Sequence, residues 1–360
     1  MQTPLILVGN RTKSGGTDSQ KPAEDLNPRQ DYAEIGRKLD GQLLGYDLSN
    51  ASWYQWVRRI EKHLKLDVVE CLAAAAQLGD HNVVLSTSEK LALPLAALMR
   101  IQRKRIPHVV IGHKLSSGYK ARLLHASALR NAFSHMICLC AAQADFAVHQ
   151  LGIPADAVDL VYDGVDHRFF RPRGEETRDF VLVVGQEQRD YRTLLRALSG
   201  TGLRLVVVAS SPWSTNGLDK SGLGQATVLS HIPYRELRSL YSQARLVVVP
   251  LFDVDYAAGV NTVLEAMAMG KPLIVSRSRG ITDYLVQGET GHYVAPGDAP
   301  ALRDAILSLW EHSPEQTRLG RNARQAVEEG LNLDNYAERV AQIVRQVAAM
   351  PTVEPVYEGG

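Results

Sequence analysis

The chain has 360 residues, of which 45% are hydrophobic and 22% are charged. Its length is more than one typical domain core needs and indicates two domains, and its composition is that of a folded globular protein rather than a disordered one. The formal net charge of +1 argues against a nucleic-acid partner. Three cysteines, Cys71, Cys138 and Cys140, are too few for a disulfide framework, and we interpret them as reduced packing residues.

The sequence pattern indicates neither a membrane span nor a secretion signal. No apolar run approaches the ~18 residues that a span needs, and the start, Met1-Gln2-Thr3-Pro4, has no signal-peptide character. We therefore expect a cytoplasmic protein. Four basic residues gather near the end of one predicted helix, and they form either a solvated helix end or a patch for an anionic acceptor or the inner membrane face: Arg100, Arg103, Lys104 and Arg105.

Hydrophobic runs alternate with helical patterns through the first half of the chain. The predicted strands are 5–8, 43–46, 82–86, 108–112, 136–140 and 158–161, and the predicted helices are 32–39, 54–64, 68–78, 91–103, 121–133 and 142–151. Strands alternating with helices predict a parallel, doubly wound sheet, which binds ligands at the carboxyl ends of its strands.

Two loops of this half follow strand ends. The first strand leads into residues 9–16, which contain Gly15 and Gly16, and then into a polar stretch, residues 17–29. Because this stretch contains two prolines, we expect a loop across an interdomain cleft, with a dispensable surface insertion as the alternative. The strand at 108–112 ends at His113, which is either a structural hydrogen-bonding residue or part of a ligand site.

The composition changes abruptly at residues 169–178, which we predict to be the hinge between the domains. Alternation of strands and helices then resumes and predicts a second parallel sheet. The predicted strands are 180–184, 203–208, 246–251 and 273–275, and the predicted helices are one that ends at 198, one within 260–270, and 235–244, 301–311, 318–329 and 335–348.

The stretch from Tyr256 to Ser276 is a strand–helix–strand unit with a small, flexible loop before its helix, Ala257-Ala258-Gly259. Free N–H groups at such a helix start, together with the positive end of the helix dipole, favour phosphate. Glu265 lies about one turn into the helix, where its carboxylate can accept hydrogen bonds from sugar hydroxyls. Alternatively, Thr262-Val-Leu-Glu265 is a T-x-x-E capping box, in which Glu265 only satisfies a backbone N–H at its own helix start.

The run from Gly259 to Pro272, followed by Gly280-Ile-Thr-Asp283-Tyr-Leu-Val-Gln-Gly288-Glu-Thr-Gly291 and by Pro296-Gly-Asp298, resembles the donor half of family 4-type (group 1) glycosyltransferases of the GT-B fold. The resemblance implies an α/β protein with two Rossmann-like, doubly wound parallel-sheet domains that face each other across a cleft. Residues 1–172 would form the acceptor-side domain, residues 173–345 the nucleotide-sugar donor domain, and residues 346–360 a C-terminal crossover and tail.

The resemblance also implies roles for individual residues. Backbone groups of Gly15 and Gly16 would face the diphosphate and the transferred sugar, and His113 would lie near the point of sugar transfer. Arg189, with Arg192 as second choice, stands in for the lysine that usually clamps the diphosphate, while Gln186 replaces the usual arginine. The remaining implied contacts are Ile232 with the base, Glu265 with the ribose, and a helix-start cradle of Gly259, Val260, Asn261 and Thr262 for the diphosphate.

The implied reaction moves a sugar from a nucleoside diphosphate sugar to the hydroxyl group of an unidentified acceptor, a glycan, a lipid or a small molecule. It would retain the anomeric configuration and need neither a cofactor nor a metal ion, so we interpret Asp253-Val-Asp255 as loop residues. Ala257 stands where many relatives have a second glutamate. Two other functions therefore stay open, a catalytically silent nucleotide-sugar-binding subunit and a sugar-nucleotide 2-epimerase of similar architecture.

Overall fold

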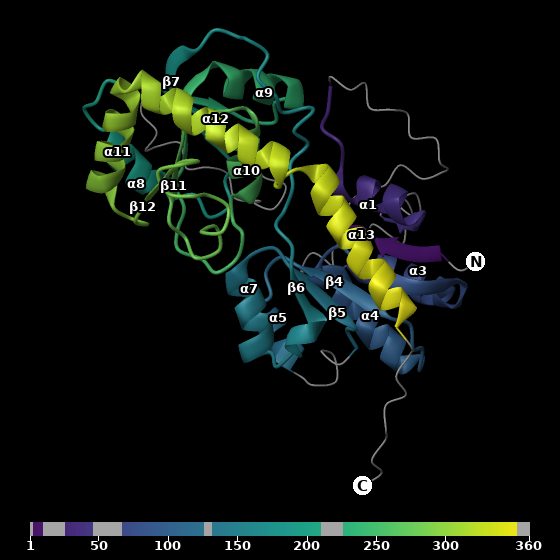
Figure 1. Cartoon of the computed structure of the whole chain (residues 1–360). Coiled ribbons are helices and arrows are strands. Elements are labelled where there is room, and N and C mark those ends of the chain that lie inside the picture. Colours follow the sequence, from purple (N-terminus) through teal and green to yellow (C-terminus); the bar gives the residue numbers. More distant parts are fainter. Residues whose placement is uncertain (1–2, 10–25, 46–66, 126–131, 210–225, 351–360) are drawn as a thin grey trace. The chain divides into compact units, whose positions relative to one another are not determined.

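The computed structural model describes residues 3–9, 26–45, 67–125, 132–209 and 226–350 (Figure 1). These residues form two compact units. The N-terminal unit takes its residues from 1–18, 30–161 and 337–360, and the C-terminal unit from 19–29 and 162–336. The domain ranges given above refer to roles in binding and stay a prediction. In the described part of the chain, no helix combines the length and the apolar character needed to cross a bilayer.

The N-terminal unit contains one parallel sheet of six strands in the order β2-β1-β3-β4-β5-β6. Its strands are β1 (Thr3–Leu7), β2 (Gln42–Leu44), β3 (His81–Ser86), β4 (His108–Gly112), β5 (His135–Cys138) and β6 (Val158–Leu160). Its helices are α1 (Asp31–Leu39), α3 (Val68–Gln77), α4 (Glu89–Ile101), α5 (Gly118–His125) and α7 (Ala141–Asp145), with shorter turns η2 (Leu78–Asp80), η3 (Phe146–Gln150) and η4 (Ala155–Ala157).

The C-terminal unit contains a second parallel six-stranded sheet, in the order β12-β11-β10-β7-β8-β9. Its strands are β7 (Arg178–Val184), β8 (Leu205–Val208), β9 (Thr227–Leu229), β10 (Ala244–Val249), β11 (Leu273–Ser276) and β12 (His292–Val294). Its helices are α8 (Tyr191–Leu198), α9 (Tyr234–Gln243), α10 (Val260–Ala268), α11 (Ala299–Glu311) and α12 (Ser313–Glu329), and α13 (Leu333–Ala349) begins in this unit and continues in the other.

Alternation along the central strands explains why helices cover both faces of the second sheet. Phe180, Leu182 and Val184 of β7 face a core that includes residues of α9, α10 and α12. Val181 and Val183 face the other core, to which α8 and α11 contribute. Successive side chains of a strand point to opposite faces, so a strand buried on both sides reads as a continuous apolar run. The prediction of two parallel, doubly wound sheets is confirmed.

Each sheet has one place where the chain changes direction across it. In the C-terminal unit the chain runs from β7 outward to β8 and β9 and then returns to β10 on the other side of β7. In the N-terminal unit β1 lies between β2 and β3. Loops after the strands that flank such a switch point diverge and leave a crevice, where ligands of this fold class bind. The switch point therefore predicts a ligand site at the loops after β7 and β10.

Some predicted elements differ from the observed ones. Strand β12 has only three residues and was not predicted. Helix α12 begins at Ser313 rather than at residue 318, because the His312 side chain accepts a hydrogen bond from the N–H of Glu315 and caps the helix. The predicted helix 142–151 is an α-helix followed by the π-helical turn η3. The predicted helix 54–64 lies outside the described residues.

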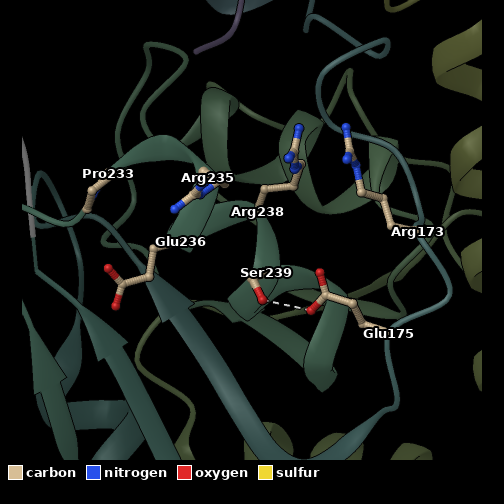
Figure 2. A pocket seen from close by; sticks show the side chains of 7 residues that line it. All are labelled: Arg173, Glu175, Pro233, Arg235, Glu236, Arg238 and Ser239. Atoms are coloured by element: carbon tan, nitrogen blue, oxygen red, sulfur yellow. Dashed lines mark hydrogen bonds between the residues drawn. The ribbon is translucent and has the colours of Figure 1, made fainter. Parts of the chain in front are cut away.

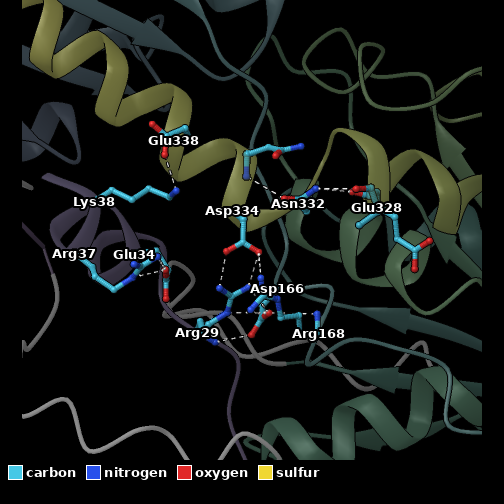
Figure 3. A network of polar contacts seen from close by, with 12 residues as sticks. Arg29, Glu34, Arg37, Lys38, Asp166, Arg168, Glu328, Asn332, Asp334 and Glu338 are labelled. Carbon is cyan, nitrogen blue, oxygen red and sulfur yellow. Dashed lines mark hydrogen bonds and ion pairs between the residues drawn. The ribbon is translucent and has the colours of Figure 1, made fainter.

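Arg29 holds two distant parts of the C-terminal unit together (Figure 3). Its guanidinium lies 2.9 Å from a carboxylate oxygen of Asp166 and 2.8 Å from one of Asp334. Its backbone N–H donates to Asp166 as well, at 2.9 Å. Arg168 adds a further ion pair to Asp334, at 3.0 Å. Because Asp166 is buried and Arg29 is mostly so, we call this group the Arg29 clamp and count it among the stronger ionic contacts of the unit.

Candidate functional site

Helix α10 begins with backbone donors that no side chain caps. Its N-cap is Gly259, in the left-handed conformation at φ 82°, and the first N–H that bonds back into the helix is that of Val263, 3.1 Å from the Gly259 carbonyl. The N–H groups of Asn261 and Thr262 precede that bond, whereas the N–H of Val260 reaches the Ala257 carbonyl at 3.3 Å. Unpaired donors at a helix start attract anions. Asn261 and Thr262 are thus better placed than Val260 to bind one.

Arg189 lies directly against this helix start. Its side chain is 8% exposed, and a Cβ atom at position 259 would come 3.0 Å from its Nη1. Its Nη2 donates to the Thr262 hydroxyl at 2.9 Å, its Nε to the Val184 carbonyl at 3.0 Å, and its Nη1 to the Glu187 carbonyl at 2.9 Å. All three acceptors are uncharged, and burial lowers the pKa of the guanidinium. Such a buried cation favours an anionic ligand.

The capping-box interpretation of Thr262 and Glu265 is wrong. Because α10 begins at Val260, Thr262 is its third residue and does not cap it. The Thr262 hydroxyl accepts from Arg189 and donates to the Val184 carbonyl at 3.3 Å. Glu265 accepts a hydrogen bond from the Tyr241 hydroxyl on α9 at 2.8 Å, and its carboxylate is not bonded to the start of its own helix. The local T-x-x-E pattern fits a cap, but the glycine N-cap three residues earlier starts the helix first.

Glu265 is an unusual carboxylate, because it lies deep among protein atoms while part of its surface still meets solvent. Burial raises its pKa to about 7, against the opposing effects of the Tyr241 hydrogen bond and the charge of Arg189. Sequence reasoning missed Tyr241, whose position on α9 indicates only a core residue. It is fully buried. A half-charged carboxylate near neutral pH, beside a buried cation, is typical of a binding or catalytic site.

His113 follows β4, at the carboxyl ends of the strands of the first sheet, and is exposed. Its backbone N–H donates to the buried carboxylate of Glu89 at 3.1 Å, which fixes the turn. Its Nε2 lies 2.9 Å from the Thr87 carbonyl. Because a carbonyl only accepts, Nε2 carries the proton, and Nδ1 is left as an acceptor in the neutral ring. Asp31 lies near this histidine, and burial raises the pKa of the Asp31 carboxyl.

The other predicted residues are placed as follows. Gly15 and Gly16 lie outside the described residues. Ile232 packs with part of its side chain against the core of the C-terminal unit. Arg192 is exposed on α8, so of the two candidate cations Arg189 is the one at the helix start. The Gln186 side chain donates to the Ala209 carbonyl at 3.1 Å.

A pocket of about 540 Å³ is lined in part by Pro233, the residue after Ile232 (Figure 2). Its rim mixes three basic and two acidic side chains, and Glu175 accepts from Ser239 at 2.7 Å. Arg238 is buried and stacks over the Phe169 ring at 4.3 Å, so it contributes to the core as well as to the pocket wall. The lining residues are Arg173, Glu175, Pro233, Arg235, Glu236, Arg238 and Ser239.

The pair Asp253 and Asp255 follows β10. Asp253 is exposed and forms an ion pair with Arg279 at 3.2 Å, and it also accepts from the backbone N–H of Arg279 at 3.0 Å. These bonds tie the loop after β10 to the loop after β11. The ion pair and the hydrogen bond give Asp253 a structural role between these two loops.

Comparison with known proteins connects this geometry with a family. Residues 180–312 match the family described as "Glycosyl transferases group 1". Over 150 residues the chain is 31% identical to D-rhamnosyltransferase WbpZ of Pseudomonas aeruginosa, and over 166 residues it is 29% identical to glycogen synthase of Mycobacterium tuberculosis. These matches cover 40% and 46% of this chain, but only 39% and 38% of the relatives. The chain thus spans less than half the length of these two curated relatives.

Solved structures extend the likeness to nearly the whole fold. Anabaena HepE in complex with UDP superimposes with a TM-score of 0.72 at 14% identity, covering 96% of this chain and 100% of that one. Sucrose-phosphate synthase of Thermosynechococcus elongatus gives a TM-score of 0.66 at 18% identity, covering 96% and 99%. Both are GT-B proteins. The chain therefore has the GT-B fold of two Rossmann-like domains, and its residues 180–312 are similar to the group 1 glycosyl transferases.

Proposed function

We propose that this protein is a glycosyltransferase that moves a sugar from a nucleoside diphosphate sugar to an acceptor hydroxyl, with retention and without a metal ion. One observation supports this most. At the switch point of the C-terminal sheet, the buried cation of Arg189 is bonded to Thr262 in the uncapped first turn of α10, and the carboxylate of Glu265 follows three residues later on the same helix. Cation, helix start and carboxylate are the groups that a diphosphate and a ribose need side by side.

The proposed catalysis depends on the negative charge that the leaving group develops. When the glycosidic bond breaks, the leaving diphosphate gains negative charge. Arg189 and the N–H groups of Asn261 and Thr262 would stabilise that charge from fixed positions, and such preorganised donors can supply what a metal ion supplies elsewhere. Glu265 would accept hydrogen bonds from the two ribose hydroxyls. A leaving group stabilised in this way suits departure and attack on the same face of the sugar, which retains configuration.

His113 has a different part in this proposal. Its Nε2–H is held by the Thr87 carbonyl, so Nδ1 can accept a hydrogen bond from a hydroxyl of the transferred sugar or of the acceptor. The rhamnosyltransferase among the relatives favours transfer over the 2-epimerase and over the silent binding subunit. Ala257 is partly buried against the core, so the loop before α10 keeps its place without the second glutamate that many relatives have.

The test is a thermal-shift panel of UDP, GDP, ADP, dTDP and their sugars, since a ligand that binds the native state raises the unfolding temperature. UDP comes first because HepE has been crystallised with it. We expect at least one compound to stabilise the protein and Glu265→Ala to abolish the shift without unfolding the chain. Glu311→Ala, an exposed glutamate at the end of α11, is the matched control and should keep the shift. A panel without any stabilising compound contradicts the proposal.

The proposal includes a cytoplasmic location and peripheral contact with the inner face of an anionic membrane. At the end of α4, Ile101 is 77% exposed, and the exposed side chains of Arg100, Arg103 and Arg105 surround it in sequence. An exposed aliphatic residue among cations fits the interface of an anionic bilayer, where each nearby cation contributes about 1 kcal/mol. Such contact would bring the N-terminal unit to a lipid-linked acceptor.

A further inference from the structure

The Tyr241 hydroxyl is bonded to one charged group of the candidate donor site, Glu265, and is near the other, Arg189. Tyr241 belongs to α9, is fully buried, and donates to Glu265 Oε2 at 2.8 Å. Its hydroxyl also lies near the Thr262 side chain, which accepts from Arg189 Nη2 at 2.9 Å. The cation and the carboxylate are thus each bonded to an uncharged hydroxyl, Arg189 to Thr262 and Glu265 to Tyr241.

A direct ion pair between Arg189 and Glu265 would compete with a ligand for both groups. Opposite charges in a buried place attract strongly, and Glu265 and Arg189 are near enough to influence each other's titration. A direct ion pair would occupy the guanidinium that a diphosphate needs and the carboxylate oxygens that ribose hydroxyls need. Tyr241 instead takes one oxygen of Glu265, and Thr262 takes one nitrogen of Arg189. The remaining oxygen and N–H groups of both residues can then serve a ligand.

We propose that Tyr241 is a positioning residue of the donor site, whose hydroxyl orients Glu265 toward the ribose and holds it apart from Arg189. This inference rests on the proposed function and adds a residue to its site. Glu265 titrates among three groups, Tyr241 and Tyr234 of α9 and Arg189 of the loop after β7. Among these, Tyr241 alone donates a hydrogen bond to the carboxylate in the described structure.

The sign of the effect on titration is fixed by the chemistry. Burial raises the pKa of Glu265 from 4.5 to about 7, and the Tyr241 bond opposes this because it stabilises the charged form. When the pKa of an acid is higher in the folded state than in the unfolded state, the folded state is favoured at a pH below the unfolded-state pKa. That gain in unfolding free energy is lost as the pH rises from the unfolded-state pKa to the folded-state pKa. For wild type that loss extends from about pH 4.5 to about pH 7. In Tyr241→Phe the folded-state pKa of Glu265 should be higher, so this loss of stability should continue to higher pH.

The first measurement needs no ligand. Unfolding free energies of wild type, Glu265→Gln, Tyr241→Phe and the double variant are compared between pH 4 and pH 9, so that each background shows the contribution of the carboxylate alone. We expect the loss of stability that depends on Glu265 to reach higher pH in the Tyr241→Phe background. Tyr293→Phe, which removes a hydroxyl bonded to the Ile281 carbonyl at 2.9 Å, is the matched control and should leave the window unchanged.

The second measurement uses UDP, with its dissociation constant determined by calorimetry at pH 8. We expect Tyr241→Phe to weaken binding about tenfold, the effect of losing one hydrogen bond to a charged group, and to have little effect when Glu265 is already glutamine. An unchanged pH window in the first measurement overturns the role of Tyr241. Failure of wild type to bind any nucleoside diphosphate, with the window shifted as expected, instead contradicts the proposed function while the contact between Tyr241 and Glu265 stands.

Discussion

The carboxyl ends of the strands in the two sheets carry polar residues in opposite settings. After β7 and β10, Arg189 and Thr262 are buried and Glu265 nearly so, and each is bonded to protein groups that also hold the fold. After β4, His113 is exposed, and its ring is bonded to one backbone carbonyl. In the second sheet, the residues of the proposed donor site also hold the fold. In the first sheet, the functional group can change with little consequence for the fold.

The largest expected effect comes from Arg189→Ala, which tests whether the loops after β7 and β10 combine stability with ligand binding. The Val184 and Glu187 carbonyls and the Thr262 hydroxyl lose their donor, so we expect a loss of about 2–4 kcal/mol in the free energy of unfolding and a loss of UDP affinity of ~100-fold or more. Denaturant unfolding and calorimetry measure the two. Arg192→Ala, an exposed arginine three residues along, should change neither. Full UDP affinity in Arg189→Ala would show that the Arg189 guanidinium does not bind the diphosphate.

A smaller effect, and one confined to rate, is expected from His113→Ala. Release of UDP from the sugar nucleotide that gives the largest thermal shift should slow by roughly 100-fold, the size of a lost acid–base or polar contact at the reacting centre. The unfolding temperature and the UDP affinity should stay at wild-type values, because the side chain is exposed. His149→Ala, another exposed histidine of the same unit, should leave all three values unchanged. Weaker UDP binding in His113→Ala would contradict a role of His113 that is confined to the rate of transfer.

The smallest effect concerns the membrane proposal. Arg105→Gln at the end of α4 should weaken binding to vesicles that contain phosphatidylserine by about fivefold, or ~1 kcal/mol. Co-sedimentation at two salt concentrations measures this, and the difference should shrink at high salt. Vesicles of phosphatidylcholine alone are the control. Equal binding of wild type to both kinds of vesicle would show that the basic residues do not contact lipid.

How far the sequence predicts the molecule depends on the distance between the residues involved. The strands β7 and β10 could be predicted because runs of buried apolar residues are local. The helix start at Gly259 and the position of Glu265 follow from a spacing of six residues. Tyr241, by contrast, is 24 residues from Glu265, and only the packing of α9 beside α10 brings them together. The capping box failed because the T-x-x-E pattern is compatible with two different helix starts, and only the observed backbone distinguishes them.

The Arg29 clamp has a practical consequence for dissecting the protein. Arg29 lies 137 residues before Asp166 and 305 residues before Asp334, yet it belongs to the same compact unit as both. A fragment cut at residue 162 would contain the whole second sheet and still lack the cation that neutralises Asp166, and an unpaired buried carboxylate costs several kcal/mol. Recombinant work on donor recognition should therefore supply residues 26–29 with the fragment, as an added peptide or a grafted leader, rather than treat the second half as self-sufficient.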